Sequence, residues 1–208
     1  MALFITFEGG EGSGKSFQAR ALYRRLCRVA IPARLTHEPG GTPLGTKIER
    51  WLKWGELKGI SPLTELMLFN ASRAQLVREV ILPGLKNGLV VICDRYADST
   101  TAYQGYGRGL ALEIVLAVNE VATQGLKPDL VVLLDIPVAD GLARKKARRP
   151  DPFEQEGITF HQRVREGYLK LAAGEPGRWL VVDTRQPRER VGEVIWRRVS
   201  RLLSRQGG

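Results

Sequence analysis

A glycine-rich stretch near the start of the chain has the residue types that bind phosphate. Residues 7–16 read FEGGEGSGKS and match the pattern G-x-x-x-x-G-K-[ST] between a strand pattern and a helix pattern. Glycines adopt the backbone angles that turn N–H groups toward an anion, and a following helix N-terminus adds partial positive charge. A flexible glycine turn is the alternative, but it does not explain this coincidence of features. We predict that a nucleotide polyphosphate binds at Gly9, Gly10, Glu11, Gly12, Ser13, Gly14, Lys15 and Ser16.

Two side chains at the end of this loop have distinct predicted roles. We expect Lys15 to bridge the β- and γ-phosphates and Ser16 to ligate Mg²⁺. Glu11 is unusual there because phosphates repel a carboxylate, so we expect it to face another group, such as a sugar hydroxyl. The loop alone does not name a reaction, since ATPases, GTPases and small-molecule kinases share it.

A second polar stretch, CDRYADSTTAYQGYGRG at 93–109, follows a predicted strand. Asp94 ends that strand, where ligands gather in open parallel sheets, so we expect it to hold Mg²⁺, directly or through water, or to orient an attacking phosphate. Arg95 can bind a phosphate through two parallel hydrogen bonds. A surface ion pair with a packing tyrosine is the alternative for Asp-Arg-Tyr. Three more side chains offer a flat face and hydrogen bonds to a base or sugar: Tyr103, Gln104 and Arg108.

Two further segments have residues suited to nucleotide chemistry. Phe69 and Arg73 share a helix face and could stack on and hydrogen-bond a nucleobase, although a core phenylalanine with a solvated arginine is the alternative. Residues 143–157, ARKKARRPDPFEQEG, change from basic to acidic through two prolines and predict a mobile lid. Cations on such a lid could neutralise charge during phosphoryl transfer and exclude water, with a basic surface helix as the alternative.

The elements that must position these residues alternate between strands and helices. Several strand patterns are apolar throughout, which is typical of a parallel sheet covered on both faces. We predict an α/β three-layer sandwich with about five parallel strands, forming one domain over residues 1–208 with the lid inserted in it. The expected strands are 3–7, 33–36, 90–93, 130–135 and 179–183. We expect helices at 16–29 and from Ser61-Pro62, the second interrupted or closed at Pro83-Gly84.

Composition narrows the class of protein. The chain has 208 residues, 43% hydrophobic and 26% charged, and no apolar run reaches the roughly 20 residues of a membrane helix. We therefore expect a cytoplasmic protein without a membrane partner, and Cys27 and Cys93 to be buried, reduced thiols. His37 and His161 stand alone and predict no metal site built from protein ligands. The net charge of +10 favours anionic partners, either nucleic acid or phosphorylated metabolites.

Together, the motifs resemble the bacterial thymidylate kinase family over nearly the whole chain. The matching stretches are 7–16, EPGGT at 38–42, LFNASR at 68–73, DRYADSTTAYQGYGRGL at 94–110, PDLVVLLD at 128–135 and FHQRVREGYLKLA at 160–172. The resemblance implies a P-loop kinase of the nucleoside-monophosphate kinase superfamily that phosphorylates dTMP with ATP and Mg²⁺ in dTTP synthesis. It further implies a homodimer without a nucleic-acid partner. The alternatives are another nucleoside-monophosphate kinase and a non-kinase P-loop ATPase.

The resemblance also assigns site residues. It implies that Phe69 stacks on thymine, Arg73 binds the carbonyl edge of thymine, and Arg95 binds the acceptor phosphate. It places Glu11 at the 3′-hydroxyl and Tyr103 near the deoxyribose, where it disfavours a 2′-hydroxyl. The complete implied dTMP set is Glu11, Pro39, Phe69, Arg73, Arg95, Ser99, Thr100, Tyr103 and Gln104.

The same resemblance implies the catalytic set. Because Gly12 follows Glu11 and the loop has no arginine, the chain resembles the family form whose lid supplies the cation, with Arg148 and Arg149 as candidates. The implied catalytic residues are Lys15, Asp94, Arg95, Arg148 and Arg149, with adenine near residues 184–186. His37 stands where relatives commonly have arginine, so we expect a weaker fixed charge contact there.

Overall fold

The structure is a computed structural model that describes residues 2–53, 59–144, 152–153 and 155–206. Within these residues, five strands form one parallel sheet in the order β2-β3-β1-β4-β5. The strands are β1 (Leu3–Glu8), β2 (Ala33–His37), β3 (Val90–Asp94), β4 (Leu130–Asp135) and β5 (Trp179–Asp183). All five strands predicted from the sequence are confirmed, and so is the parallel sheet.

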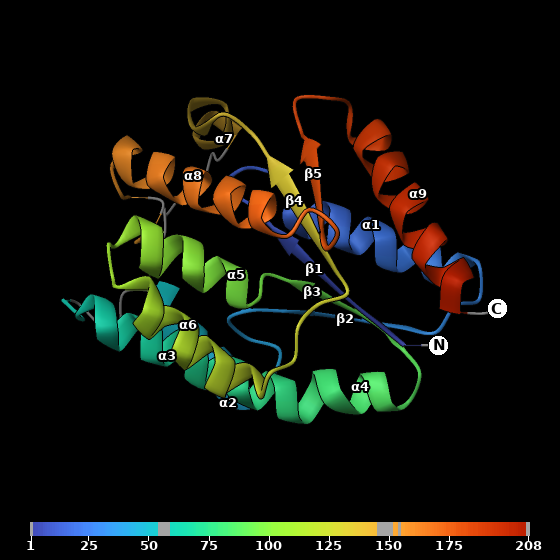
Figure 1. Ribbon diagram of the computed structural model, residues 1–208, viewed down its shortest axis with the longest axis horizontal. Helices are drawn as coiled ribbons and strands as arrows, with labels where there is room; N and C mark the ends of the chain where they lie inside the picture. Colours follow the sequence, from blue (N-terminus) through green and yellow to red (C-terminus); the bar gives the residue numbers. More distant parts are fainter. Residues whose placement is uncertain (1, 54–58, 145–151, 154, 207–208) are drawn as a thin grey trace.

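Helices cover both faces of this sheet, as Figure 1 shows. The α-helices are α1 (Lys15–Arg28), α2 (Pro43–Lys53), α3 (Pro62–Leu76), α4 (Leu82–Lys86), α5 (Ala97–Thr100), α6 (Leu112–Thr123), α7 (Val138–Arg144), α8 (Ile158–Gly174) and α9 (Arg188–Gln206). Two π-helical segments, η1 (Val77–Ile81) and η2 (Thr101–Gly107), continue α3 and α5. Helices α1 and α9 pack on one face, and the α3–η1 and η2–α8 groups pack on the other. This arrangement confirms the predicted three-layer sandwich.

The central strand explains why the sheet is rigid. Every residue of β1 is buried, and β1 pairs with β3 on one side and β4 on the other. On one face, Ile5 and Phe7 pack with Leu22 and Leu26 of α1. On the other face, the ring of Phe4 meets that of Tyr96 edge-on at 4.9 Å between centroids. The loop between β1 and α1 is therefore held at both ends by buried apolar contacts.

The long helical segment after Ser61 follows the sequence signals. The Ser61 hydroxyl accepts the backbone N–H of Thr64 at 3.1 Å, and Pro62 occupies the first turn. The regular α-helix is interrupted at η1, before Pro83, where the Leu82 N–H bonds to the Val77 carbonyl five residues earlier. Proline has no N–H to donate, and the wider π turn accommodates this. The predicted interruption is confirmed, whereas the chain remains helical to Lys86 instead of closing at Pro83.

The two cysteines differ in environment. Cys93 is buried at the end of β3, but Cys27 is exposed, so the prediction of two buried thiols is wrong for Cys27. The reason is helical periodicity: Cys27 follows exposed Arg20 and Arg24 along the outer side of α1. Both thiols are free. Across the described ranges, no helix is both long and apolar enough to cross a membrane.

Candidate active site

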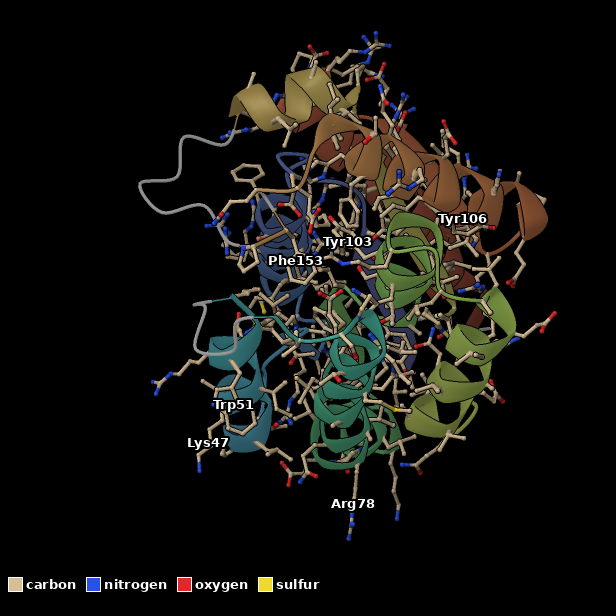
Figure 2. The ribbon with its side chains drawn as sticks, turned by 90° about the vertical axis from the view of Figure 1, so that its left-hand side faces the viewer. Lys47, Trp51, Arg78, Tyr103, Tyr106 and Phe153 are labelled. Atoms are coloured by element: carbon tan, nitrogen blue, oxygen red, sulfur yellow. The ribbon has the colours of Figure 1, made fainter. Side chains whose placement is uncertain are left out.

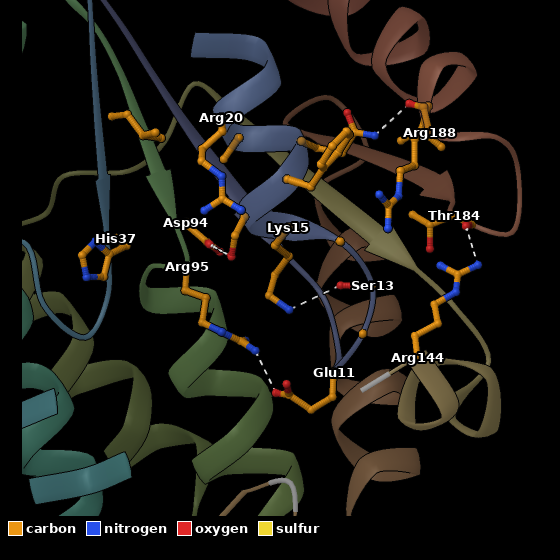
Figure 3. Close-up of a pocket in the computed structure, with 18 of the residues that line it drawn as sticks. Glu11, Ser13, Lys15, Arg20, His37, Asp94, Arg95, Arg144, Thr184 and Arg188 are labelled. Atoms are coloured by element: carbon orange, nitrogen blue, oxygen red, sulfur yellow. Dashed lines mark hydrogen bonds and ion pairs between the residues drawn. The ribbon is translucent and has the colours of Figure 1, made fainter. Parts of the chain in front are cut away.

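The polar residues predicted to do chemistry meet at the carboxyl edge of the sheet. Strands β1 and β3 are neighbours and end in Glu8 and Asp94, and β2 beside them ends in His37. A cavity of about 1050 Å³ opens there, lined by residues 11–20 of the loop and α1, the ends of β2 and β3, and residues 184 and 186–188. Figure 3 shows the loop curving around this cavity. The loop and the ends of β2 and β3 therefore share one cavity at this edge of the sheet.

The glycine-rich loop needs glycine where the chain turns. Gly9, Gly12 and Gly14 have φ angles of +140°, +67° and +91°, which other residues rarely adopt. A side-chain carbon at Gly12 would also lie 1.9 Å from the carbonyl oxygen of Gly141 in α7. The loop conformation and the close approach of α7 thus both depend on Gly12.

Lys15 lies inside the loop with only neutral oxygen partners at hydrogen-bonding distance among the residues described. Its ammonium donates to the Gly10 carbonyl at 2.7 Å and to the Ser13 hydroxyl at 3.3 Å. Burial, with a smaller contribution from nearby Arg95, lowers the pKa of Lys15 to about 8, against the opposing effect of Glu11 and other carboxylates. An anion that entered the loop would favour the charged ammonium, so the side chain is suited to phosphate.

Ser16 and Asp94 bring two oxygen ligands together at the base of the cavity. The Ser16 hydroxyl donates a hydrogen bond to Asp94, which joins the start of α1 to the end of β3. Mg²⁺ prefers such oxygens and usually keeps several waters and substrate phosphates as its other ligands. No group of three or more His, Cys, Asp or Glu residues in the described ranges could hold a metal unaided. These two residues fit Mg²⁺ that arrives with a nucleotide.

Arg95 projects from the end of β3 toward the loop. Its backbone has φ of +74°, an uncommon conformation for a non-glycine residue that often marks functional positions. Its guanidinium donates to the Gly9 carbonyl (3.3 Å), Ser99 (3.1 Å), Tyr168 (3.3 Å), Glu11 (3.0 Å) and Tyr103 (3.1 Å). The Tyr103 hydroxyl donates to the same Glu11 oxygen at 2.8 Å. Arg95, Glu11 and Tyr103 therefore form one connected group between two cavities.

Glu8 is a residue of this network that the sequence motifs did not identify. It is fully buried and accepts hydrogen bonds from the Tyr96 N–H (2.8 Å), Ser99 (2.5 Å) and Tyr168 (3.0 Å). Because both hydroxyls donate to Glu8, their lone pairs are free to accept from Arg95. Burial, with a smaller contribution from Asp98, raises the pKa of Glu8 to about 7. Glu8 thus orients the groups that hold Arg95.

A second cavity of about 60 Å³ adjoins the first on the side of α3 and η2. All nine residues predicted to bind the acceptor line it: Glu11, Pro39, Phe69, Arg73, Arg95, Ser99, Thr100, Tyr103 and Gln104. Glu38, Lys53, Tyr96 and Phe153 complete the lining. Glu11 and Arg95 line both cavities, so the two spaces meet at the end of the phosphate loop.

Phe153, one of the described residues of the predicted lid segment, lines this second cavity. Its ring lies 5.7 Å from that of Phe69 and 6.0 Å from that of Tyr103, measured between centroids. Figure 2 shows Phe153 beside Tyr103, and both residues line the second cavity. The predicted lid cations Arg148 and Arg149 lie outside the described residues.

Arg73 is an almost completely buried charged side chain of the site. It is 1% exposed, which rules out the solvated arginine considered from the sequence. All five of its N–H groups have protein acceptors: Glu38 (2.8 Å), Asn70 (3.0 Å), Asn119 (2.9 Å), the Tyr96 carbonyl (3.1 Å) and Thr100 (2.7 Å). Burial raises the pKa of Glu38, while Arg73 acts in the opposite direction. Arg73 therefore fixes the positions of other groups around the cavity.

The far end of the first cavity is formed by two arginines and the loop after β5. Arg144 donates to the Thr184 carbonyl at 3.1 Å, and Arg188 lies 4.8 Å above the ring of Phe17. Thr184 and Gln186, near which adenine was expected, line the cavity. Figure 3 shows Arg144, Thr184 and Arg188 on the opposite side of the loop from Arg95.

His37 takes part in a small ion-pair group at the edge of the first cavity. Its Nε2 atom lies 3.6 Å from a Glu49 oxygen, and Glu49 also accepts from Lys53 at 2.8 Å. The Glu49 hydrogen bond raises the pKa of His37, so the imidazolium is favoured more than in a solvated histidine. Unlike a fixed arginine charge, this contact still requires protonation of His37.

The fold and these two cavities together define a class of protein. A parallel sheet with a phosphate loop after its central strand, beside a polar cavity that shares Arg95 and Glu11, is typical of P-loop kinases that act on small phosphorylated acceptors.

Comparisons with known proteins identify the family. The family model described as "Thymidylate kinase" matches residues 7–195. A thymidylate kinase of Dehalococcoides mccartyi is 54% identical over 203 residues, covering 98% of each chain. One of Deinococcus radiodurans is 50% identical over 199 residues, covering 95% of this chain and 96% of that one. The crystal structure of thymidylate kinase from Ehrlichia chaffeensis matches with a TM-score of 0.73 at 32% identity, over 87% of this chain and 92% of the other. The chain belongs to the thymidylate kinase family.

Proposed function

We propose that this protein transfers the γ-phosphoryl group of ATP to dTMP, which yields dTDP and ADP. The observation that carries the proposal is the junction of the two cavities: the phosphate loop lines one, the nine expected acceptor residues line the other, and Glu11 and Arg95 line both. Phosphoryl transfer needs donor and acceptor phosphates to be aligned and their charge neutralised, with no covalent enzyme intermediate. Arg95, which lines both cavities, can bring the two phosphates together and neutralise part of their charge.

The donor triphosphate occupies the glycine-rich loop in this proposal. The loop amides and Lys15 hold the β- and γ-phosphates, and Ser16 and Asp94 hold Mg²⁺, directly or through water. Bound Mg²⁺ neutralises charge on the phosphate oxygens. Adenine lies at the end of the first cavity that is lined by Arg144 and, in the loop after β5, by Thr184 and Gln186.

The acceptor nucleotide lies in the second cavity, with its phosphate toward Arg95. Arg95 can exchange its bonds to Tyr103 and Glu11 for two parallel bonds to phosphate oxygens. Glu11 then accepts from the 3′-hydroxyl, and the Tyr103 ring beside the deoxyribose disfavours a 2′-hydroxyl. These placements explain why a carboxylate is tolerated in a phosphate loop.

The base-binding end of the cavity combines an aromatic ring with polar groups of fixed orientation. Phe69 offers its face for stacking on thymine. Thr100 accepts a hydrogen bond from Arg73, which leaves the Thr100 hydroxyl hydrogen available to a carbonyl of the base. Arg73 thus supports recognition of the thymine carbonyl, either directly, by exchanging a partner, or through Thr100.

We further propose that the lid segment 143–157, with Arg148 or Arg149, supplies the cation that neutralises charge during transfer. One domain, residues 1–208, carries both sites. A homodimer is supported by the outer surface of α3 and α6, two helices that pack against each other. Their exposed apolar side chains are Leu63, Met67, Ile114, Leu116 and Val121. A cytoplasmic location stays a prediction.

ADP release in the presence of ATP and Mg²⁺ tests the proposed function. The acceptors are dTMP, dUMP, dCMP, dGMP and AMP, and we expect dTMP to give the highest kcat/KM. A clear preference for another acceptor would overturn the substrate assignment. Turnover of ATP without phosphorylation of any acceptor, together with salt-dependent nucleic-acid binding, would identify a P-loop ATPase instead.

A further inference from the structure

Gln104 lines the second cavity from η2, and the amino group of its side-chain amide is hydrogen-bonded to Glu65. Its Nε2 atom donates to Glu65 at 2.8 Å, and Gln104 is 1% exposed. Glu65 lies in the first turn of α3 and does not line the cavity. The amino end of the amide therefore points away from the cavity toward Glu65. The carbonyl oxygen of Gln104 receives no hydrogen bond from the described residues.

The carboxylate of Glu65, which can only accept hydrogen bonds, fixes this orientation of the Gln104 amide. Glu65 is 6% exposed, and the guanidinium of Arg108 donates to both of its carboxylate oxygens, each at 3.2 Å. A carboxylate held in this way only accepts hydrogen bonds, so an amide that turned its oxygen toward Glu65 would place two acceptors in contact. Arg108 is itself held on its other side by Glu156. The carboxylate thus has a fixed position as well as a fixed polarity.

We infer that Glu65 is a positioning residue that sets the base specificity of the acceptor site through Gln104. This inference rests on the proposed function, because it places the acceptor base in the second cavity. The carbonyl oxygen of Gln104, a residue that lines the second cavity, accepts a hydrogen bond from an imide N–H, which thymine and uracil carry at N3. Cytosine has a lone pair at N3, which would face the same oxygen and be left buried without a donor. Glu65 therefore excludes cytosine without touching the nucleotide.

Glu65→Gln tests this role with dUMP and dCMP as the two acceptors. Both lack the 5-methyl group, so they differ only at N3 and at position 4 of the base; Glu65→Gln leaves Arg73 and Thr100 unchanged, so a change in their ratio reports on the N3 contact. A glutamine at position 65 can offer either its carbonyl or its amino group, so that Gln104 can turn over. We expect the dUMP/dCMP ratio of kcat/KM to fall tenfold or more, with an absolute rise for dCMP and an unchanged KM for ATP. If dCMP turnover is too slow to measure, inhibition constants against dTMP give the same ratio.

A matched control separates specificity from packing. Glu156→Gln removes the same charge from the other side of Arg108, but among the described residues no hydrogen bond joins Glu156 to Gln104. We expect this variant to keep the wild-type ratio within about threefold. If Glu65→Gln lowers kcat/KM for both acceptors in equal proportion, Glu65 is only structural and the inference is overturned.

Two further measurements keep the inference testable. If Glu65→Gln does not fold, as judged by circular dichroism, Glu65→Asp keeps the charge for Arg108 but draws the carboxylate back from Gln104. The same fall in the dUMP/dCMP ratio is then expected, and an unchanged ratio overturns the inference. Wild-type turnover of dTMP decides the proposed function by itself, so the two proposals can fail separately.

Discussion

Removing the guanidinium that separates the two cavities should stop transfer while leaving the donor site intact. Arg95 lines both cavities, and its side chain is 20% exposed, so its charge is only partly screened by solvent. Two charge-assisted hydrogen bonds to an acceptor phosphate contribute about 1.5–3 kcal/mol each. Part of this gain offsets the loss of the contacts that Arg95 makes with Glu11 and Tyr103 in the nucleotide-free protein. The net loss on Arg95→Ala is about 4 kcal/mol, or roughly a thousandfold in kcat/KM for dTMP.

Coupled ADP-release assays and calorimetric titration with a non-hydrolysable ATP analogue measure this prediction. We expect the Kd of the analogue to change by less than about threefold, since Lys15 and the loop amides are untouched. Arg24→Ala, the same change on the exposed side of α1, serves as the control and should leave both quantities unchanged. A kcat/KM for Arg95→Ala within tenfold of the wild-type value would refute the placement of the acceptor phosphate at Arg95.

Three other changes probe the loop, the buried network and the lid. Gly12→Ala places a carbon against the Gly141 carbonyl at a φ of +67°, so it should lower the free energy of unfolding by about 2 kcal/mol and weaken ATP binding; unchanged urea unfolding would contradict this. The pKa of Glu8, raised from 4.5 to about 7, means that the folded protein binds more protons in this window, so stability falls as pH rises through it. Glu8→Gln should flatten that slope in urea titrations between about pH 5 and 7, and a persistent slope would assign it to other groups. Replacing Arg148 and Arg149 together with Gln should lower kcat about a hundredfold. An unchanged kcat would show that neither arginine neutralises charge during phosphoryl transfer.

The fold could be predicted because its signals are local. The five strands are short apolar runs with clear boundaries, and Ser61-Pro62 marks the start of α3 by capping and by the fixed φ of proline. The exposure of Cys27 was missed because burial was expected from the residue type, although helical periodicity places Cys27 in line with Arg20 and Arg24. The register of a helix against its sheet depends on packing with α9, far along the chain.

The site was predictable only where a motif names its residues. The glycine-rich loop and the stretch after β3 contain Lys15, Asp94 and Arg95 in recognisable order. Glu8 has no such context, because its partner Tyr168 is 160 positions away and the two meet only when α8 packs on the sheet. Glu65 pairs with Gln104 across 39 positions for the same reason. Sequence also placed Arg73 at the base without showing that all its N–H groups are already bonded, which is a property of the folded cavity.

A crystal structure with dTMP and a non-hydrolysable ATP analogue tests most directly whether the two cavities hold donor and acceptor. We expect the triphosphate to lie along residues 9–16, the thymine ring to lie against Phe69, and the dTMP phosphate to contact Arg95. Density for the triphosphate elsewhere, or for thymine outside the cavity between Phe69 and Tyr103, would contradict the proposed function.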